Sequence, residues 1–391
     1  MIDTIQTIIH TRELEEICDK LRSRPYVAID TEFMREQTYH PKLCLVQVAN
    51  NEVAALIDPL SQTLSLEPLC RVLRDQSVVK VFHAARQDIE IFFKLMGEVP
   101  LPIFDTQIAA MVCGYGEQVS YDNLVNIVTT KNIDKSSRLM DWSRRPLTEP
   151  QLKYALGDVT HLRTVYEHLN SMLKENNRSD WIEDEMAILR NPVTYVTKPQ
   201  EAYKRIKTLT RSRRYMGLLQ EVAAWREHTA QTKNVPRSRI LRDESLMEIA
   251  GHPPASADDL EKIRGIPKGW SKSEMGDTLM AAIRTGQSKS EENLPAVPKK
   301  KPSIPIRGLG PLVDLLKVLL KARCEDVGVA GKLVANVADL EEIAKGEQGK
   351  TVAALSGWRF DIFGRDALDL RAGRICLMYD RGQVITIRPN E

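Results

Sequence analysis

The sequence predicts an α/β domain, with a mixed β-sheet and flanking helices, followed by two small all-α bundles. Three observations predict this fold class. Short β-rich runs occupy the first part of the chain, helical and strand patterns then alternate, and almost every segment after about residue 209 has a helical pattern. With 391 residues, 42% of them hydrophobic and 28% charged, the chain has room for roughly two to three domains and can bury a sizeable core.

The first domain begins with β-rich runs that polar turns separate. We expect strands at residues 26–33, 43–49, 53–57 and 79–82, and helices at residues 66–74 and 87–96. Three early strands followed by alternating helices and strands indicate a sheet with mixed pairing.

A long amphipathic helix is expected from Thr148 to Asn176. Thr148 is a suitable N-cap, and Glu149, Pro150 and Gln151 fit the first helical turn. The apolar stripe of this helix consists of Leu152, Leu156, Val159, Leu162, Tyr166 and Leu169.

The rest of the chain is predicted to be helical. Helices are expected at residues 215–228, 243–250, 257–263 and 272–285, with short Gly/Pro turns between them. Several short helices in under ~90 residues make a small bundle. Because residues 209–286 and 310–380 are similar in length and both helical, they could be two copies of one module.

Proline-rich segments divide the chain into three predicted domains. These are residues 1–190, 209–287 and 310–391, with linkers at residues 191–208 and 288–309. The second linker is rich in Pro and Lys and shows neither a helical nor a strand period, so it is expected to be exposed. At the first linker, a helical region gives way to Pro-interrupted extended sequence.

Charge is unevenly distributed along the chain. Residues 1–190 carry 21 Lys/Arg against 28 Asp/Glu, whereas residues 191–300 carry 20 against 13 and residues 301–391 carry 14 against 12. An acidic region suits a site that holds cations, and a basic region suits a polyanionic partner. An uneven solvated surface would give the same counts, so both interpretations stay open.

Several protein classes are not expected. The apolar runs are only a few residues long, whereas a membrane-spanning helix needs ~20 apolar residues. The N-terminus has no basic region before a long apolar core, so a secretory leader is not expected. Six widely spaced cysteines without C-x-x-C disfavour a disulfide framework and a thiolate zinc site, which favours a cytoplasmic location.

Acidic residues mark three candidate positions for chemistry. Asp30 and Glu32 end a buried strand, where residues i and i+2 project to the same side. Asp88 opens a helix after the strand VKVF, and Tyr154 and Asp158 share one face of the long helix. Each feature is common by itself, as a solvated strand end or a carboxylate at a helix N-terminus.

Together, these residues are more specific than any one of them. Four carboxylates without His or Cys in the pattern suit hard cations such as Mg²⁺ or Mn²⁺. A pair of such ions can activate water and stabilise a leaving oxygen in phosphodiester hydrolysis. A fifth acid, Asp105, is expected to cap a helix rather than bind metal.

The motifs AIDTEF, FHAARQD and YALGD resemble the three motifs of the DEDDy 3′–5′ exonucleases, and the sequence around them resembles bacterial ribonuclease D. The resemblance extends over the whole chain: residues 209–286 resemble an HRDC domain, and residues 310–380 resemble a second, more divergent one. It implies a ribonuclease-H-like fold for residues 1–190. It also implies removal of single nucleotides from the 3′ end of RNA, including transfer RNA precursors.

The resemblance also implies roles for the acidic residues. Asp30 would contact both metal ions, Glu32 and Asp158 would complete the site that binds the nucleophilic water, and Asp88 would help to hold the second ion. Tyr154 would orient the water rather than act as a base, because an unperturbed phenol has a pKa of ~10.

Further residues are candidates for RNA contacts, each with a structural alternative. In the first domain they are Phe33, Met34, His83, Lys135, Trp142, Arg144 and Arg145. In the basic segment, residues 198–214, they are Lys204, Arg205, Lys207, Arg211, Arg213 and Arg214. Aromatic side chains could stack bases and cations could contact phosphates. Core packing, anchoring of the loop and a solvated basic face are the alternatives.

The sequence therefore predicts a metal-dependent 3′–5′ exoribonuclease that uses two divalent ions, Mg²⁺ or Mn²⁺, and yields nucleoside 5′-monophosphates. Its expected partner is RNA with a free 3′ end, with neither a membrane nor an obligate protein partner. A proofreading-type DNA exonuclease and a non-catalytic nucleic-acid-binding protein on a nuclease scaffold remain alternatives, because the carboxylates alone do not select the sugar.

Overall fold

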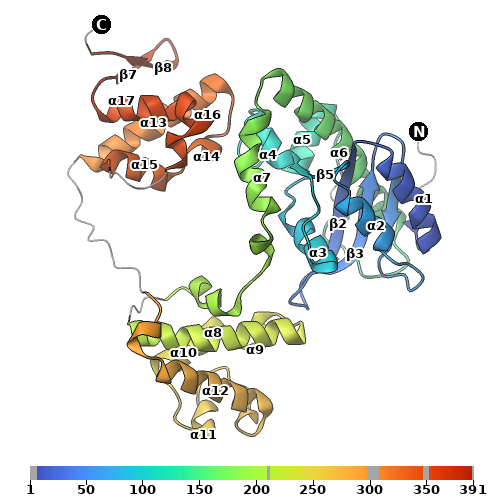
Figure 1. Cartoon of the computed structure of the whole chain (residues 1–391), viewed down its shortest axis with the longest axis vertical. Coiled ribbons are helices and arrows are strands. Elements are labelled where there is room, and N and C mark those ends of the chain that lie inside the picture. Colours follow the sequence, from blue (N-terminus) through green and yellow to red (C-terminus); the bar gives the residue numbers. More distant parts are fainter. Residues whose placement is uncertain (1–6, 135, 209–211, 297–307, 347–351, 390–391) are drawn as a thin grey trace.

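The computed structural model of the chain describes residues 7–134, 136–208, 212–296, 308–346 and 352–389. It has three parts, which Figure 1 separates by colour. We refer to residues 7–190 as the sheet domain, to the described residues between 198 and 296 as the central module and to the described residues between 309 and 387 as the C-terminal module. None of the helices in these ranges is long and apolar enough to cross a membrane.

The sheet domain contains a six-stranded mixed sheet. Its strands are β1 (Thr7–Ile8), β2 (Tyr26–Met34), β3 (Lys42–Ala49), β4 (Ala54–Ile57), β5 (Val79–Phe82) and β6 (Ile103–Asp105), in the order β1-β4-β3-β2-β5-β6. Strand β2 pairs antiparallel with β3 and parallel with β5. The prediction of a sheet with mixed pairing is confirmed. Strands β1 and β6 were not predicted because runs of two or three residues are too short to show the alternation of apolar and polar side chains.

Seven α-helices of the described chain accompany the sheet. They are α1 (Thr11–Arg22), α2 (Glu67–Arg74), α3 (Arg86–Met96), α4 (Thr106–Val112), α5 (Tyr121–Thr129), α6 (Glu149–Glu175) and α7 (Glu183–Arg190). Helix α6 has the predicted N-cap, because the Thr148 side chain and Gln151 form a reciprocal capping box. Its buried face packs against β2, β3 and β4, which brings Asp158 of the helix beside the second half of β2.

The central module is built around α8 (Arg213–Lys233). It also contains α9 (Arg237–Ile240), α10 (Asp243–Gly251), α11 (Ala257–Leu260) and α12 (Glu274–Ser288). The predicted linker 191–208 is not a free connector: its 3-10 helix Pro199–Arg205 places Ala202, and the following Ile206, in the core beneath α8. The predicted exposure of the second linker is also wrong at its start, since Leu294 is buried against Gly217.

In its described residues, 309–346 and 352–387, the C-terminal module is helical up to residue 371. It contains α13 (Leu309–Val327), α14 (Gly331–Val334), α15 (Val337–Lys345), α16 (Gly357–Arg359) and α17 (Arg365–Arg371). The expectation of an all-α bundle is wrong for its end, where β7 (Cys376–Asp380) and β8 (Gln383–Ile387) form an antiparallel hairpin. The two turn residues, Arg381 and Gly382, both have positive φ angles, as a tight hairpin requires.

The C-terminal module shares one continuous hydrophobic core with the sheet domain. Trp181 and Trp358 stack with ring centroids 4.4 Å apart. The Arg178 guanidinium donates to the backbone oxygen of Val327 at 2.7 Å, and Arg359 forms an ion pair with Asp184. This module is therefore packed onto α7 and its surroundings, where Figure 1 also places it.

The central module contacts the sheet domain through polar side chains instead. The Tyr39 hydroxyl donates to Glu227 and accepts from Arg237 at 2.9 Å. The His40 backbone amide donates to the Asn234 side chain at 3.0 Å. Both contacts join the loop between β2 and β3 to the C-terminal end of α8 and the residues that follow it.

Candidate active site

Three carboxylates converge beside the second half of β2, which continues past both of its acids to Met34. Asp30 and Glu32 project from β2 to the same side, and Asp158 reaches them from the buried face of α6. One oxygen from each of the three carboxylates lies within 4.8 Å of the others. The strand and helix were predicted to present these residues, and the structure brings them together.

Asp88 lines the same cavity but lies outside this tight group. It is in the first turn of α3 and is only 7% exposed. Thr31 lies between Asp30 and Glu32 on β2, and its hydroxyl donates to the Asp88 Oδ1 at 2.5 Å. This bond ties α3 to β2. All four carboxylates line one cavity of about 670 Å³.

Asp105 acts as a structural cap, as predicted. Its carboxylate accepts from the backbone amide of Gln107 at 2.8 Å and so begins α4. It also accepts from the amides of Ala84 at 3.0 Å and Ala85 at 2.9 Å. Ala84 has a φ of +56°, a strained value for alanine, so Asp105 stabilises the sharp turn that positions Asp88 on α3.

The four acids have raised pKa values. Burial raises the pKa of Asp30 to about 6. Burial, followed by repulsion from Asp30, Asp158 and Asp88, raises the pKa of Glu32 to about 10. Burial is likewise the main cause for Asp88 and Asp158, with repulsion from Asp30 next in each case.

The described lining of the cavity has little positive charge to relieve this repulsion. Of the described residues that line it, Arg138 is the one Lys or Arg, and it is largely exposed. Buried carboxylates without counter-charges are costly, and metal ions are a common solution. An all-oxygen set of ligands fits Mg²⁺ or Mn²⁺ better than zinc. The residues present therefore fit a divalent cation site.

Tyr154 lies one helical turn before Asp158 and lines the same cavity. Burial, and then the neighbouring carboxylates, raise the pKa of its phenol well above the usual value. The hydroxyl therefore keeps its proton at neutral pH and can donate a hydrogen bond, but it cannot act as a base.

His83 and Phe33 also line this cavity. The Nδ1 of His83 lies 3.0 Å from the Thr106 hydroxyl, and burial lowers its pKa, so the imidazole is neutral. Its Nε2 is buried and has no partner among the described residues. Met34 instead packs against the small apolar cluster around Trp142. Lys135 lies outside the described residues.

Two of the predicted RNA contacts are contradicted. Trp142 is 2% exposed and packs with Cys44, Leu45 and Leu56, so it anchors its loop and cannot stack a base. Arg145 is committed to a bidentate ion pair with Asp58, at 2.5 and 2.7 Å. For Trp142 the alternative, anchoring of the loop, is therefore the one that the structure confirms. Residue type and a place on the loop before α6 cannot distinguish an exposed tryptophan or arginine from one that holds a loop in place.

Arg144 differs from its neighbour. Its side chain is 84% exposed, and its contact with Asp141 is an i,i+3 surface pair at 3.2 Å. Such a pair is weak, so the guanidinium remains accessible. An RNA contact by Arg144 stays a prediction.

The basic segment 198–214 divides into two groups. Arg213 and Arg214 bind the backbone oxygens of Glu291, Leu294 and Lys289, so they hold the chain after α12 onto α8. The side chains of Lys204, Arg205 and Lys207 are exposed, although Lys204 pairs with Glu201 at 3.5 Å. Arg211 lies outside the described residues.

Several residues of the cavity were not predicted, among them Tyr121, Arg138, Gln87 and a further acid, Asp122. Tyr121 donates to the backbone oxygen of Asp158 and so fixes α6 at the site. Arg138 lies on the loop before α6, and Gln87 lies on α3 between Arg86 and Asp88. Tertiary contacts alone bring Tyr121 and Arg138 to the site, so no spacing in the sequence identifies them. Gln87 could have been found from its position beside Asp88.

The chain is similar to known nucleases over most of its length. Residues 5–174 match the family model described as 3′-5′ exonuclease, and residues 216–283 match the HRDC domain. The chain is 48% identical to Ribonuclease D of Granulibacter bethesdensis over 96% of this chain and 95% of that protein. It is also 48% identical to Ribonuclease D of a Jannaschia species, over 97% and 98%.

Solved structures are also similar to this chain. The crystal structure of Escherichia coli RNase D, an exoribonuclease involved in structured RNA processing, superposes with a TM-score of 0.78 at 29% identity. The match covers 94% of this chain and 98% of that one. The catalytic core of Trypanosoma brucei RRP6 superposes with a TM-score of 0.56 at 21% identity, which shows a common fold alone.

Proposed function

The chain belongs to the ribonuclease D family and is a 3′–5′ exoribonuclease, and we propose that it trims the 3′ ends of transfer RNA precursors. The E. coli relative is involved in structured RNA processing, which supports a folded substrate for this chain. We further propose that the products are nucleoside 5′-monophosphates and that the enzyme acts in the cytoplasm. The six cysteines, all free, are consistent with a reducing compartment.

We propose two divalent ions, Mg²⁺ or Mn²⁺, as cofactors. Asp30, Glu32 and Asp158 would hold one ion, and Asp30 with Asp88 would hold the other. When bound, such ions lower the pKa of water and stabilise the charge that develops on the leaving oxygen. The observation that carries the proposal is the group of three carboxylates within 4.8 Å, with raised pKa values and little opposing charge.

The protein's own groups would position the reactants. Tyr154 keeps its phenolic proton and would orient the attacking water by a hydrogen bond. Phe33 lines the cavity beside Glu32 and offers an apolar surface for the terminal base. Neutral His83 lines the cavity with part of its side chain exposed and would pack against the RNA rather than remove a proton.

Labelled RNA tests this function directly. Single-stranded RNA labelled at the 5′ end should give a ladder of products shortened one nucleotide at a time, whereas RNA labelled at the 3′ end should release the label at once. EDTA should abolish both results, and Mg²⁺ or Mn²⁺ should restore them. A matched DNA strand cleaved faster than RNA would favour the proofreading alternative, and no cleavage of either would favour a non-catalytic scaffold.

We also propose that the C-terminal module is a second, divergent copy of the HRDC domain. The short helices α9 and α14 begin at Arg237 and Gly331, and the nine-residue helices α10 and α15 begin at Asp243 and Val337. Both pairs are 94 residues apart, and the left-handed caps Asn234 and Gly328 keep the same offset. Equal spacing of three features supports duplication, although the family model matches only the central module.

A further inference from the structure

A second large cavity separates the sheet domain from the central module. Its volume is about 950 Å³, and its walls come from α3, the loop after β2, residues 194–205 and α8. The five Lys/Arg residues that line it are Arg35, Arg86, Lys94, Arg205 and Arg237. The one carboxylate in its described lining is Glu90. We refer to it as the basic cavity.

Three of these five cations are already engaged. Arg35 pairs with Glu90 at 2.6 Å, Arg237 pairs with Glu227, and the Lys94 ammonium lies 3.2 Å from His40. Arg86 and Arg205 differ. Within the described chain Arg86 makes no hydrogen bond or ion pair. Arg205 has a 3.4 Å contact with the Thr197 hydroxyl and a longer-range attraction to Glu227, a carboxylate that Arg237 already pairs. Both are exposed, so two guanidinium groups are available to an anion.

The basic cavity also offers aromatic surface. Phe93 from α3 and Tyr195 line it, with ring centroids 5.8 Å apart. Single-stranded nucleic acids are bound where cations meet the phosphates and aromatic rings meet the bases. Arginine groups with nearby aromatic rings therefore favour a single strand of RNA over a compact anion such as free phosphate.

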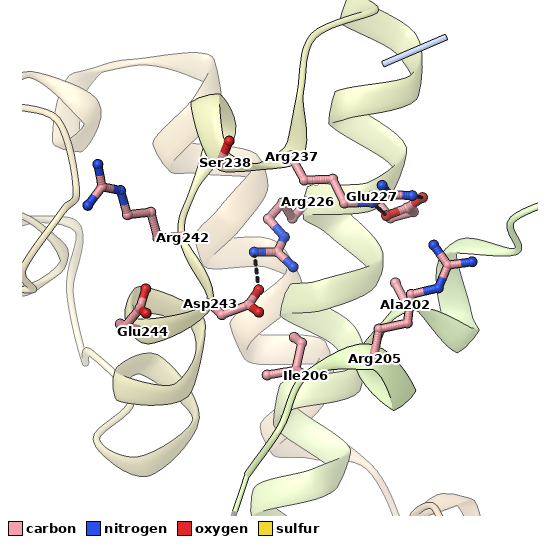
Figure 2. A pocket seen from close by; sticks show the side chains of 10 residues that line it. All are labelled: Ala202, Arg205, Ile206, Arg226, Glu227, Arg237, Ser238, Arg242, Asp243 and Glu244. Carbon is pink, nitrogen blue, oxygen red and sulfur yellow. Dashed lines mark hydrogen bonds and ion pairs between the residues drawn. The ribbon is translucent and has the colours of Figure 1, made fainter. Parts of the chain in front are cut away.

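The first turn of α3 connects this cavity to the active site. Three consecutive residues make the connection: Arg86 lines the basic cavity, Gln87 lines both cavities, and Asp88 lines the active site. At the opposite end, Arg205 and Arg237 also line a pocket of about 370 Å³ on the central module. Figure 2 shows both arginines on one side of that pocket and Arg242 on the other.

We propose that the basic cavity holds the single-stranded RNA just upstream of the terminal nucleotide, with phosphates on Arg86 and then on Arg205. The strand would leave the active site past Gln87 and continue towards the central module. This inference rests on the proposed exoribonuclease function and adds the route of the substrate. It also separates Arg205 from Lys204, its neighbour in the basic segment, which does not line the cavity.

The test uses the full chain with Asp30→Asn to prevent cleavage, and compares Arg86→Ala/Arg205→Ala with the charge-matched control Arg12→Ala/Lys233→Ala. The control residues are exposed, belong to the same two parts of the protein and line neither cavity. Binding of a dinucleotide and of longer single strands is measured across a range of salt. Two lost phosphate contacts should reduce the slope of log K against log salt by ~1.4 for the longer strands.

The length of the RNA strand then shows which of the two arginines lies nearer the active site. Arg86→Ala should weaken binding at shorter lengths than Arg205→Ala, because Arg86 lies nearer the active site. The proposal is overturned if the test variant and the control keep the same slope, or if dinucleotide binding falls as much as that of longer strands. Cleavage of RNA by the wild-type protein is measured separately, so a failure of the proposed function would be seen there and not in the slopes.

Discussion

The active-site cavity and the basic cavity are neighbours with opposite character. They meet at Gln87, yet one is lined by four carboxylates with raised pKa values and the other by five cations. The carboxylates are buried or half-buried, whereas Arg86 and Arg205 are exposed. Burying like charges costs free energy, whereas exposed charges cost little.

This difference assigns separate tasks to the two cavities. The acidic cavity is organised at a cost in stability that the proposed divalent ions would offset, so it should determine the rate. The basic cavity is assembled from exposed side chains of two parts of the protein, so it should determine affinity and its dependence on salt. Substitutions in one cavity should therefore leave unchanged the property that the other cavity controls.

The largest effect is expected from Asp30→Asn. This change removes the charge at the centre of the carboxylate group and should lower kcat by several orders of magnitude, because metal ions contribute several kcal/mol of transition-state stabilisation. Binding of RNA in the basic cavity should persist. Single-turnover rates and fluorescence anisotropy measure the two properties separately.

The exposed surface residue Asp19 provides the control for this comparison, since Asp19→Asn removes the same charge from α1. Near-wild-type turnover in correctly folded Asp30→Asn would contradict the assignment of the metal site. Loss of RNA binding together with activity would contradict the separation of tasks.

A smaller loss of rate is expected from Tyr154→Phe. The substitution removes one hydroxyl and keeps the ring that packs 6.0 Å from Trp142, so the fold and metal affinity should be retained. Groups that position or transfer protons contribute ~10²–10⁴-fold to the rate. Rapid-quench measurement of kcat at saturating RNA tests this. Tyr379→Phe, at a 74% exposed tyrosine of the hairpin, is the control, and equal rates in the two variants would remove Tyr154 from the mechanism.

The sequence was most informative where a local pattern carries the function. Asp30 and Glu32 share one face of a strand, and Tyr154 and Asp158 share one face of a helix, so the periods of strand and helix predict both pairs. The Thr148 cap and the mixed sheet follow from the same kind of local pattern, and the structure confirms both.

The sequence was least informative where tertiary contacts decide. Burial of Trp142 and the pairing of Arg145 with Asp58 depend on residues far away in the sequence, so the sequence left both an RNA contact and a structural role open for these residues. The basic segment shows the same limit, because Arg213 and Arg214 bind the module's own backbone whereas Arg205 faces a cavity. Composition reports how many charges are present, but the fold determines which are free.

A third prediction concerns stability against pH. Asp30 has a folded pKa of about 6 against an ordinary 3.8, so its favourable contribution is complete below pH 3.8 and lost as the pH rises through about 6. In EDTA, Asp30→Asn should therefore be more stable than wild type at about pH 8, by at most about 3 kcal/mol, and little different at about pH 4. Thermal unfolding at both pH values measures this.

Divalent ions should reverse the order at high pH. Mg²⁺ or Mn²⁺ at about 100 times its Kd should stabilise the wild type by about 2.7 kcal/mol and the variant by less. A wild-type protein that is more stable than Asp30→Asn in EDTA at both pH values would show that the acidic cavity carries no cost. The contrast with the basic cavity would then fail.

The smallest effect is expected where the central module meets the sheet domain. The Tyr39 hydroxyl accepts from Arg237 and Gln231 and donates to Glu227, and it lies on the wall of the basic cavity. Tyr39→Phe keeps the ring beneath the Arg237 guanidinium and removes these bonds, each worth about 0.5–1.5 kcal/mol net. The two walls of the basic cavity should then be held together less firmly.

We expect the KM for long single strands to rise by less than about tenfold. The kcat for a dinucleotide, which reaches only the acidic cavity, serves as the reference. A fall in that kcat equal to the rise in KM would mean that the polar contact acts on the active site itself, and that the two cavities are not independent.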